Sequence, residues 1–145
     1  MALVLTESQE RRILEHLEKC YPEEGCGFLI GRAVEGDRRV IRVQPSQNYG
    51  GESRGRRYSI DPKEFMMADQ GARADHLDIV GIYHSHPDHP AAPSEFDRVN
   101  AWVGYSYVVV GVEKGKSKGF TSWTMNRENG EFLSEEIRRE NEYVD

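Results

Sequence analysis

The sequence predicts an α/β fold in a single domain over residues 1–145, with one mixed β-sheet flanked by helices. Short apolar runs rich in β-branched residues, which are typical of buried strands, recur along the chain, as at residues 79–83 and 108–110. Segments with apolar residues at helical spacing and good helix-start residues lie between some of these runs. Because strands and helices do not alternate strictly, we expect a mixed sheet.

The first helix is predicted over residues 7–20. Thr6 and Gln9 have the spacing of a capping box, in which each side chain bonds the backbone N–H of the other residue. Apolar positions then recur at helical spacing: Ile13, Leu14, Leu17 and Cys20. His16 lies beside this stripe and is expected at the surface or half-buried, and Tyr21-Pro22 ends the helix.

Two strands joined by a turn are expected to follow. Residues 27–32 and 38–43 have strand composition, and Glu35-Gly36-Asp37 between them is typical of a turn. Residues 44–57 are polar and glycine-rich and are predicted to form a long loop, which in a compact domain is usually functional or disordered. A short strand is expected over residues 57–60.

A second helix is predicted from residue 62 to about residue 74. Asp61 is a good N-cap, and Pro62 suits the first helical position because its missing N–H has no partner there. Met66 and Met67 are expected to pack against the rest of the protein rather than to contact a cofactor.

The apolar run at residues 79–83 predicts a buried strand that continues to His86. Side chains alternate along a strand, so His84 and His86 are expected to point to the same side. Pro87 cannot donate to a central ladder and should end the strand.

The remaining elements follow from the same signals. Ser94 with Asp97 three residues later reads as a helix start, so Asp97 would lie in the first turn and face back toward the histidines. From residue 94 onward we predict a helix over 94–102, strands over 105–112 and 119–125 joined by a charged turn, an Asn129-Gly130 turn, a strand over 131–133, and a terminal helix or loose tail over 134–145.

His84, His86 and Asp97 would together supply two imidazole nitrogens and one carboxylate, the ligand set of an open catalytic zinc site. A His-x-His pair by itself is more often a pair of surface histidines, but the strand, the proline and the downstream Ser-x-x-Asp favour ligands. The chain has neither the His-Glu-x-x-His helix of zincins nor a Cys-x-x-Cys pair.

Four other side chains near these residues are weaker ligand candidates. His89 and Asp88 lie in the loop after the strand, where His89 suits the rim of a site. His76 and Asp78 precede the strand at its opposite end, roughly 20 Å away along an extended chain.

The run His84-Ser85-His86-Pro87 followed by Ser94-x-x-Asp97, with ten residues between His86 and Asp97, resembles the signature of the JAMM (MPN-plus) metalloprotease family. The family's upstream Pro-x-Glu-x-x-Gly segment matches residues 22–27 and aligns its glutamate with Glu24. The resemblance covers nearly the whole chain and is greatest to small stand-alone bacterial members, including hydrolases that act on ubiquitin-like sulfur-carrier proteins. It implies the MPN fold, a mixed sheet flanked by helices.

The resemblance also implies how such a site works. One zinc ion per chain would be held by His84, His86 and Asp97, leaving a position for a water whose pKa falls to about 7. Glu24 would be the general base, and Ser94 would support the oxyanion. From the residues alone, Glu24 reads equally as a solvated turn residue and Ser94 as a plain N-cap.

The resemblance points to a zinc metallopeptidase that cleaves a peptide or isopeptide bond after the C-terminal Gly-Gly tail of a ubiquitin-like or sulfur-carrier protein. We expect the tail to lie extended at a sheet edge, with residues 44–57 ordering over it. Two alternatives remain open: a catalytically silent MPN scaffold, and a zinc amidase that acts on a small molecule.

Composition limits the partners and the compartment. A charged fraction of 30% and a net charge of −6 argue against general nucleic-acid affinity. No apolar run reaches the roughly 20 residues of a membrane span, and the N-terminus has no signal pattern, so a cytoplasmic location is expected. Cys20 and Cys26 are read as buried small hydrophobes rather than nucleophiles, and homodimer formation is left open.

Overall fold

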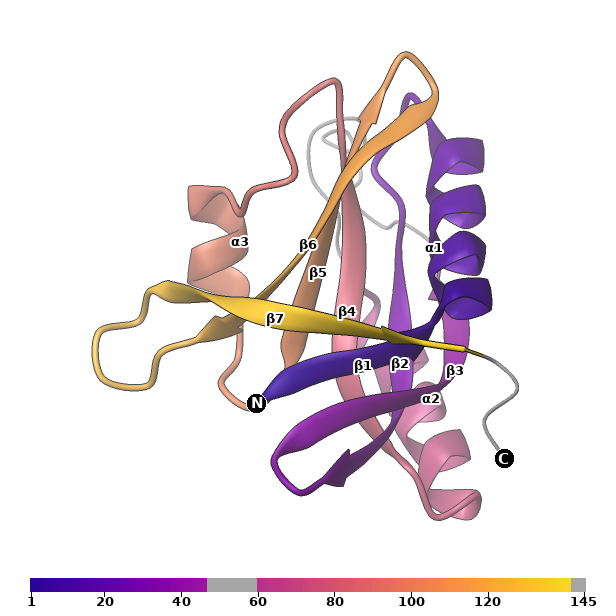
Figure 1. Ribbon diagram of the computed structural model, residues 1–145, viewed down its shortest axis with the longest axis vertical. Coiled ribbons are helices and arrows are strands. Elements are labelled where there is room, and N and C mark those ends of the chain that lie inside the picture. Colours follow the sequence, from indigo (N-terminus) through magenta and orange to yellow (C-terminus); the bar gives the residue numbers. More distant parts are fainter. Residues whose placement is uncertain (47–59, 142–145) are drawn as a thin grey trace.

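The computed structural model describes residues 1–46 and 60–141, and its strands form a closed barrel of mixed strand directions (Figure 1). The strand order around the barrel is β1-β3-β2-β4-β5-β6-β7. The strands are β1 (Ala2–Thr6), β2 (Cys26–Val34), β3 (Asp37–Ser46), β4 (Asp78–Pro87), β5 (Ser106–Glu113), β6 (Lys116–Met125) and β7 (Phe132–Glu140). The helices are α1 (Glu7–Cys20), α2 (Pro62–Ala74) and α3 (Glu95–Asn100).

Both predicted long helices form where the sequence places them. In α1, Gln9 N–H donates to Thr6 Oγ1 at 3.1 Å and Thr6 N–H donates to Gln9 Oε1 at 2.8 Å, which completes the capping box. In α2, Asp61 accepts the Lys63 N–H at 3.0 Å, with Pro62 at the start of the helix. Local capping chemistry therefore defines these two helices.

The mixed strand directions confirm the α/β prediction, but the sheet is a closed barrel rather than an open layer. Closure depends on β1, which pairs in parallel with both β3 and β7. We did not predict β1. The terminal helix or loose tail expected over residues 134–145 is also wrong, because residues up to 140 belong to a strand, β7 (Phe132–Glu140). Residues 142–145 lie outside the described residues.

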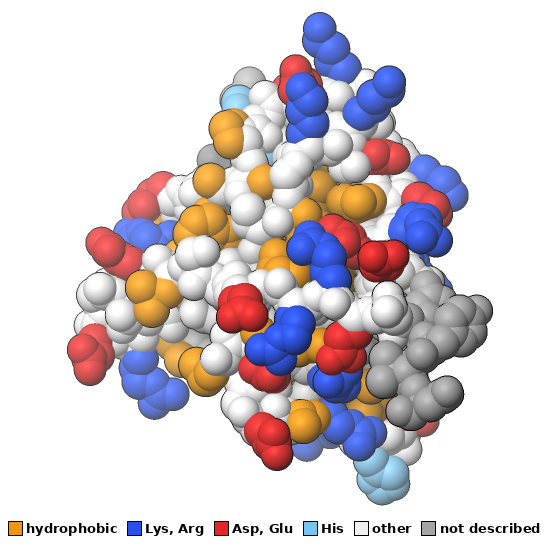
Figure 2. All heavy atoms as spheres, in the orientation of Figure 1, with side chains coloured by type: hydrophobic (Ala, Val, Ile, Leu, Met, Phe, Trp, Pro, Cys, Tyr) orange, Lys and Arg blue, Asp and Glu red, His pale blue; other side chains and the backbone are white. Residues whose placement is uncertain are grey.

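Several long charged side chains of β7 pair with side chains on neighbouring elements. Arg138 pairs with Asp37 at 2.9 Å, and Arg139 pairs with Glu10 at 2.7 Å. Acidic and basic side chains are accordingly interspersed over this face of the molecule (Figure 2). On the inner side, buried Glu135 accepts hydrogen bonds from Ser106 at 2.7 Å and from other polar groups.

The central strands are buried on both faces, as predicted for residues 108–110. One apolar cluster packs against α1 and includes Tyr83, and the other packs against α2 and includes Ile82. Because side chains alternate along β4, His84 and His86 share the α2 face with Ile82, and Ser85 shares the α1 face with Tyr83. The fold thus delivers both histidines to one end of β4, on the α2 side.

Several boundaries differ from the prediction. The third helix stops at Asn100 instead of residue 102, because Ala101 is extended and the Trp102 N–H donates to Tyr107 Oη at 2.7 Å. Met66 and Met67 do not pack: their side chains are 53% and 62% exposed on α2.

The predicted loop over residues 44–57 is also wrong at its start, because residues 44–46 belong to β3. The rest of that loop, and the strand expected over residues 57–60 apart from Ile60, lie outside the described residues. Among the helices of the described segments, none has the length and apolar character needed to cross a membrane.

Candidate metal centre

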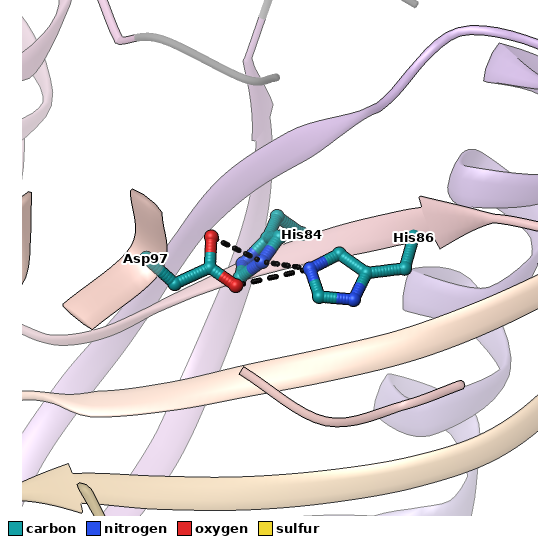
Figure 3. A group of neighbouring side chains, drawn as sticks. All are labelled: His84, His86 and Asp97. Carbon is teal, nitrogen blue, oxygen red and sulfur yellow. Dashed lines mark hydrogen bonds and ion pairs between the residues drawn. The ribbon is translucent and has the colours of Figure 1, made fainter. Parts of the chain in front are cut away.

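The end of β4 and the first turn of α3 bring His84, His86 and Asp97 together (Figure 3). His84 Nε2 lies 3.2 Å from Asp97 Oδ1, His86 Nε2 lies 3.0 Å from Asp97 Oδ2, and the two Nε2 atoms are 3.2 Å apart. The side chains of His84 and Asp97 are buried, and that of His86 is 12% exposed. The structure therefore places all three predicted ligands in one largely buried cluster.

The spacing of these atoms suits a zinc ion. In a tetrahedral site with ligands at about 2.0–2.1 Å, neighbouring ligand atoms are roughly 3.3 Å apart. The two Nε2 atoms are 3.2 Å apart, and each lies 3.0–3.2 Å from a different oxygen of Asp97, so the three side chains form a triangle of nitrogen and oxygen donors that zinc accepts. The residues present thus fit a zinc ion bound through three protein ligands.

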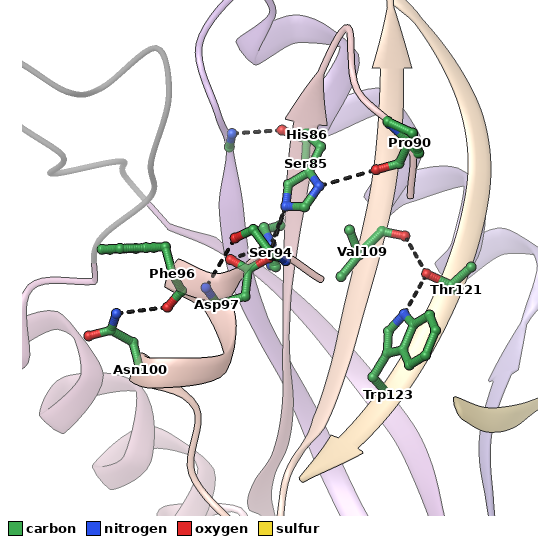
Figure 4. Close-up of polar contacts among 12 residues, drawn as sticks. Ser85, His86, Pro90, Ser94, Phe96, Asp97, Asn100, Val109, Thr121 and Trp123 are labelled. Atoms are coloured by element: carbon green, nitrogen blue, oxygen red, sulfur yellow. Dashed lines mark hydrogen bonds and ion pairs between the residues drawn. The ribbon is translucent and has the colours of Figure 1, made fainter. Parts of the chain in front are cut away.

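Hydrogen bonds outside the triangle orient two of the ligands (Figure 4). His86 Nδ1 lies 3.2 Å from the Pro90 carbonyl oxygen, which favours a proton on Nδ1 and leaves the Nε2 lone pair directed at the cluster. Asp97 Oδ2 accepts the Ser94 N–H at 2.8 Å. Lone pairs of His86 and Asp97 then face each other, so the cluster needs a cation there, either a proton or a metal ion.

Electrostatics favours the ligand forms of Asp97 and His84, whereas burial of His86 is outweighed by the hydrogen bond and charge of Asp97, which raise the pKa of the His86 imidazole. Burial opposes the charge on Asp97, yet hydrogen bonds from His84 and His86 hold the pKa of its carboxyl well below the usual range. Burial lowers the pKa of His84, which keeps that imidazole neutral near pH 7. A carboxylate and a neutral imidazole are the protonation states that metal binding requires.

Glu24 lies in the same pocket as this cluster. It is 3% exposed, whereas neighbouring Glu23 is exposed, so the reading of Glu24 as a solvated turn residue is wrong. A pocket of about 510 Å³ is lined by Glu24, His86, Ser94 and Asp97, among others. The placement comes from β2, whose first residue, Cys26, pairs with His84.

Ser94 occupies the N-cap of α3, as the sequence predicts. Its Oγ accepts the Asp97 N–H at 3.1 Å, and the residue is exposed to the pocket. Because this bond uses an oxygen lone pair, the hydroxyl hydrogen remains able to donate to a bound group. The geometry allows capping and oxyanion donation at the same time.

The rival ligands lie elsewhere. Asp88 accepts hydrogen bonds from Tyr21 Oη at 2.8 Å and the Lys114 N–H at 2.9 Å, which hold its side chain outside the triangle. His89 is exposed and lines the pocket, as expected for a rim residue. His76 and Asp78 are exposed at the other end of β4.

The surroundings of both cysteines disfavour the thiolate form. Cys26 is fully buried in β2, and burial raises the pKa of its thiol to about 12. Cys20 is half-buried rather than buried as expected, and burial also raises the pKa of its thiol. Both thiols are therefore protonated at neutral pH.

Sequence reasoning missed two pockets that adjoin the metal cluster. An apolar pocket of about 370 Å³ shares Phe96 with the metal pocket, and Phe65 and Trp102 form part of its wall. A second pocket, lined partly by Trp123, shares Pro93 and Ser94 with the metal pocket. Trp102 lies just beyond the Ser94-x-x-Asp97 segment, so its position in the sequence could have indicated a pocket beside the cluster. We predicted Trp102 inside a helix instead and did not consider it as part of a pocket wall.

The chain is similar to several known proteins. A family model described as prokaryotic homologs of the JAB domain matches residues 6–126. A desampylase of Haloferax volcanii is 37% identical over 89 residues, which is 61% of this chain and 62% of that protein. A probable TtuB-protein conjugate cleaving protease of Thermus thermophilus is 36% identical over 98 residues, covering 68% of this chain and 62% of that protein.

These matches therefore span less than two thirds of the length of either curated relative. A solution structure of a protein from Desulfitobacterium hafniense is similar over 97% of this chain and 94% of that one, with a TM-score of 0.84 and 32% identity.

Proposed function

The chain belongs to the family of prokaryotic JAB-domain homologues, and from that premise we propose that it is a zinc metallopeptidase that cleaves ubiquitin-like or sulfur-carrier protein conjugates. The observation that carries the proposal is the convergence of two imidazole nitrogens and the Asp97 carboxylate, with nitrogen–nitrogen and nitrogen–oxygen distances of 3.0–3.2 Å, at a pocket that buried Glu24 also lines. The names of the two curated relatives, a desampylase and a TtuB-conjugate protease, support this class of substrate.

In this proposal His84, His86 and Asp97 hold the zinc ion, and Glu24 and Ser94 act on the substrate. Zinc would act as a Lewis acid that makes a water molecule able to attack at neutral pH. Glu24 takes a proton from the attacking water and delivers it to the leaving nitrogen as the C–N bond breaks. Ser94 Oγ–H donates to the carbonyl oxygen as negative charge develops on it.

The neighbouring pockets favour a polypeptide over a small-molecule amide. The apolar pocket meets the metal pocket at Phe96, and the third pocket meets it at Ser94, so binding surface extends on two sides of the reacting centre. A small amide would occupy only the metal pocket, whereas an extended tail would fill its neighbours as well. Cleavage of protein conjugates is therefore better supported than hydrolysis of a small-molecule amide.

The barrel changes one expectation about how the tail binds. β4 is paired with β2 as far as His84 and with β5 as far as Pro87, so little of its length is open to an added strand. We propose instead that the tail lies across the pockets at the end of β4. Glycines before the scissile bond would let the tail backbone approach the cluster closely, where a β-branched side chain would be obstructed.

A matched pair of substrates tests the function. Two adducts of a sulfur-carrier protein with a C-terminal amino acid differ only in Gly-Gly or Val-Val before the scissile amide. We expect zinc-loaded protein to cleave the Gly-Gly adduct and a chelator to stop cleavage, with the Val-Val adduct cleaved much more slowly. Equal cleavage of the two adducts would support the small-molecule amidase, as would hydrolysis of a small acyl-amide with neither adduct cleaved. A protein that holds no zinc and cleaves none of these substrates would support the catalytically silent scaffold.

Trp102→Ala is expected to weaken the use of protein conjugates selectively. The Trp102 side chain is 55% exposed beside the apolar pocket, and its ring is held edge-on against Phe65 with centroids 5.5 Å apart. A rigid, exposed tryptophan is a common anchor for a bound chain, so we expect kcat/KM for a conjugate to fall about tenfold, equal to about 1.4 kcal/mol.

The control for Trp102→Ala is Leu133→Ala, which truncates a comparably exposed side chain (51%) on β7. Steady-state kinetics with a conjugate and with a short acyl-amide separate docking from chemistry. An equal fall with both substrates, or with both variants, would argue against Trp102 as a substrate contact.

A further inference from the structure

Ser85 stands between the two histidines in sequence but faces the other way. Alternation along β4 puts its side chain on the face of Tyr83, away from the metal cluster. The residue is fully buried, with no exposed surface. It therefore cannot contact a metal ion or a substrate in the pocket, and its position calls for another role.

Two hydrogen bonds join Ser85 to Gly25, the residue after Glu24. Ser85 Oγ accepts the Gly25 N–H at 2.9 Å, and the Ser85 N–H donates to the Gly25 carbonyl oxygen at 3.0 Å. The second bond uses only backbone atoms, but the first exists only because residue 85 carries a hydroxyl. That bond is buried, so without the hydroxyl the Gly25 N–H would lose its acceptor away from water.

Gly25 is also packed closely against α1. A Cβ at this position would lie 2.7 Å from Cys20 Sγ and 3.0 Å from Leu17 Cδ2. Gly25 is thus enclosed between the hydroxyl of β4 and the end of α1. Because Gly25 cannot shift easily in either direction, the peptide unit that joins it to Glu24 has a defined position.

We propose that Ser85 is a positioning residue, whose Oγ–Gly25 hydrogen bond holds Glu24 in place at the pocket. The inference rests on the proposed function, in which Glu24 moves the proton. The same strand then does two things: its α2 face presents the two metal-ligand candidates, and its α1 face fixes the carboxylate that must work beside them. Misplacement of a reacting group by about 1 Å can cost about a hundredfold in rate.

Ser85→Ala tests this role. We expect kcat to fall between about 10- and 100-fold with KM and zinc content unchanged. Ser85→Thr keeps the hydroxyl and is expected to recover most of the rate. Ser122→Ala is the control, because it removes a hydroxyl from another buried serine, on β6, which donates to Glu135 of β7 at 2.8 Å. This variant is expected to leave kcat unchanged.

A measurement that needs no activity accompanies the kinetics. Amide hydrogen exchange by NMR should show a protected Gly25 N–H in wild type and in Ser85→Thr, and faster exchange of this amide in Ser85→Ala. Loss of zinc together with kcat in Ser85→Ala, an unchanged kcat, or unchanged Gly25 protection would overturn the proposal. If wild type hydrolyses nothing, the proposed function fails, and the exchange result still decides whether Ser85 holds the segment.

Discussion

Glu24→Gln is expected to slow hydrolysis strongly while leaving the fold and the zinc content unchanged. The substitution keeps the size of the side chain and removes its ability to take a proton. General acid–base catalysis typically contributes 10²–10⁴-fold, so we expect kcat to fall by about that factor. Zinc should stay because the cluster of potential ligand atoms within 4.8 Å of one another consists of His84, His86 and Asp97, without Glu24.

The matched control is Glu23→Gln, which removes the same charge one residue away. Glu23 is exposed, whereas Glu24 is 3% exposed and lines the metal pocket. Steady-state kinetics with a carrier conjugate, together with elemental analysis of both variants, gives the answer. Full turnover by Glu24→Gln would place the base elsewhere, and loss of zinc from this variant would make Glu24 a ligand instead.

The predictions that succeeded rest on local chemistry. Thr6 and Asp61 cap α1 and α2 through contacts within three residues along the chain, so the sequence contains the whole signal. The cluster of His84, His86 and Asp97 was predictable for a similar reason. Alternation along one strand aligns the histidines, and the cap of the next helix turns Asp97 toward them.

The predictions that failed depend on contacts between distant segments. β7 reads as a charged tail, and it becomes a strand because β1, more than 130 residues earlier, provides its parallel partner from Ala2↔Glu136 to Thr6↔Glu140. The exposure of Met66 and Met67 likewise depends on which face of α2 meets β4, which periodicity alone did not reveal. The bond from Gly25 to Ser85 crosses 60 residues and has no local signature.

His86→Ala is expected to lose most of the bound zinc and with it the hydrolytic activity. His86 Nε2 is one corner of the triangle, and its removal leaves only His84 and Asp97 as protein ligands. Loss of a residue that merely orients a ligand typically costs 10–100-fold in metal affinity, so loss of the ligand itself should cost at least about that much. Elemental analysis of protein purified without added metal should fall from near one zinc per chain to a small fraction of that.

The control for this variant is His89→Ala, which removes an exposed imidazole from the rim of the same pocket and should keep its zinc. Thermal unfolding provides a second measurement that does not depend on turnover. Metal that binds only the folded state raises the unfolding temperature, so a chelator should lower the Tm of wild type and of His89→Ala. The Tm of His86→Ala should not respond to the chelator, because little metal remains to be removed. Full zinc content in His86→Ala, or an equal loss in both variants, would mean that the ion is held by atoms other than the triangle of His84, His86 and Asp97.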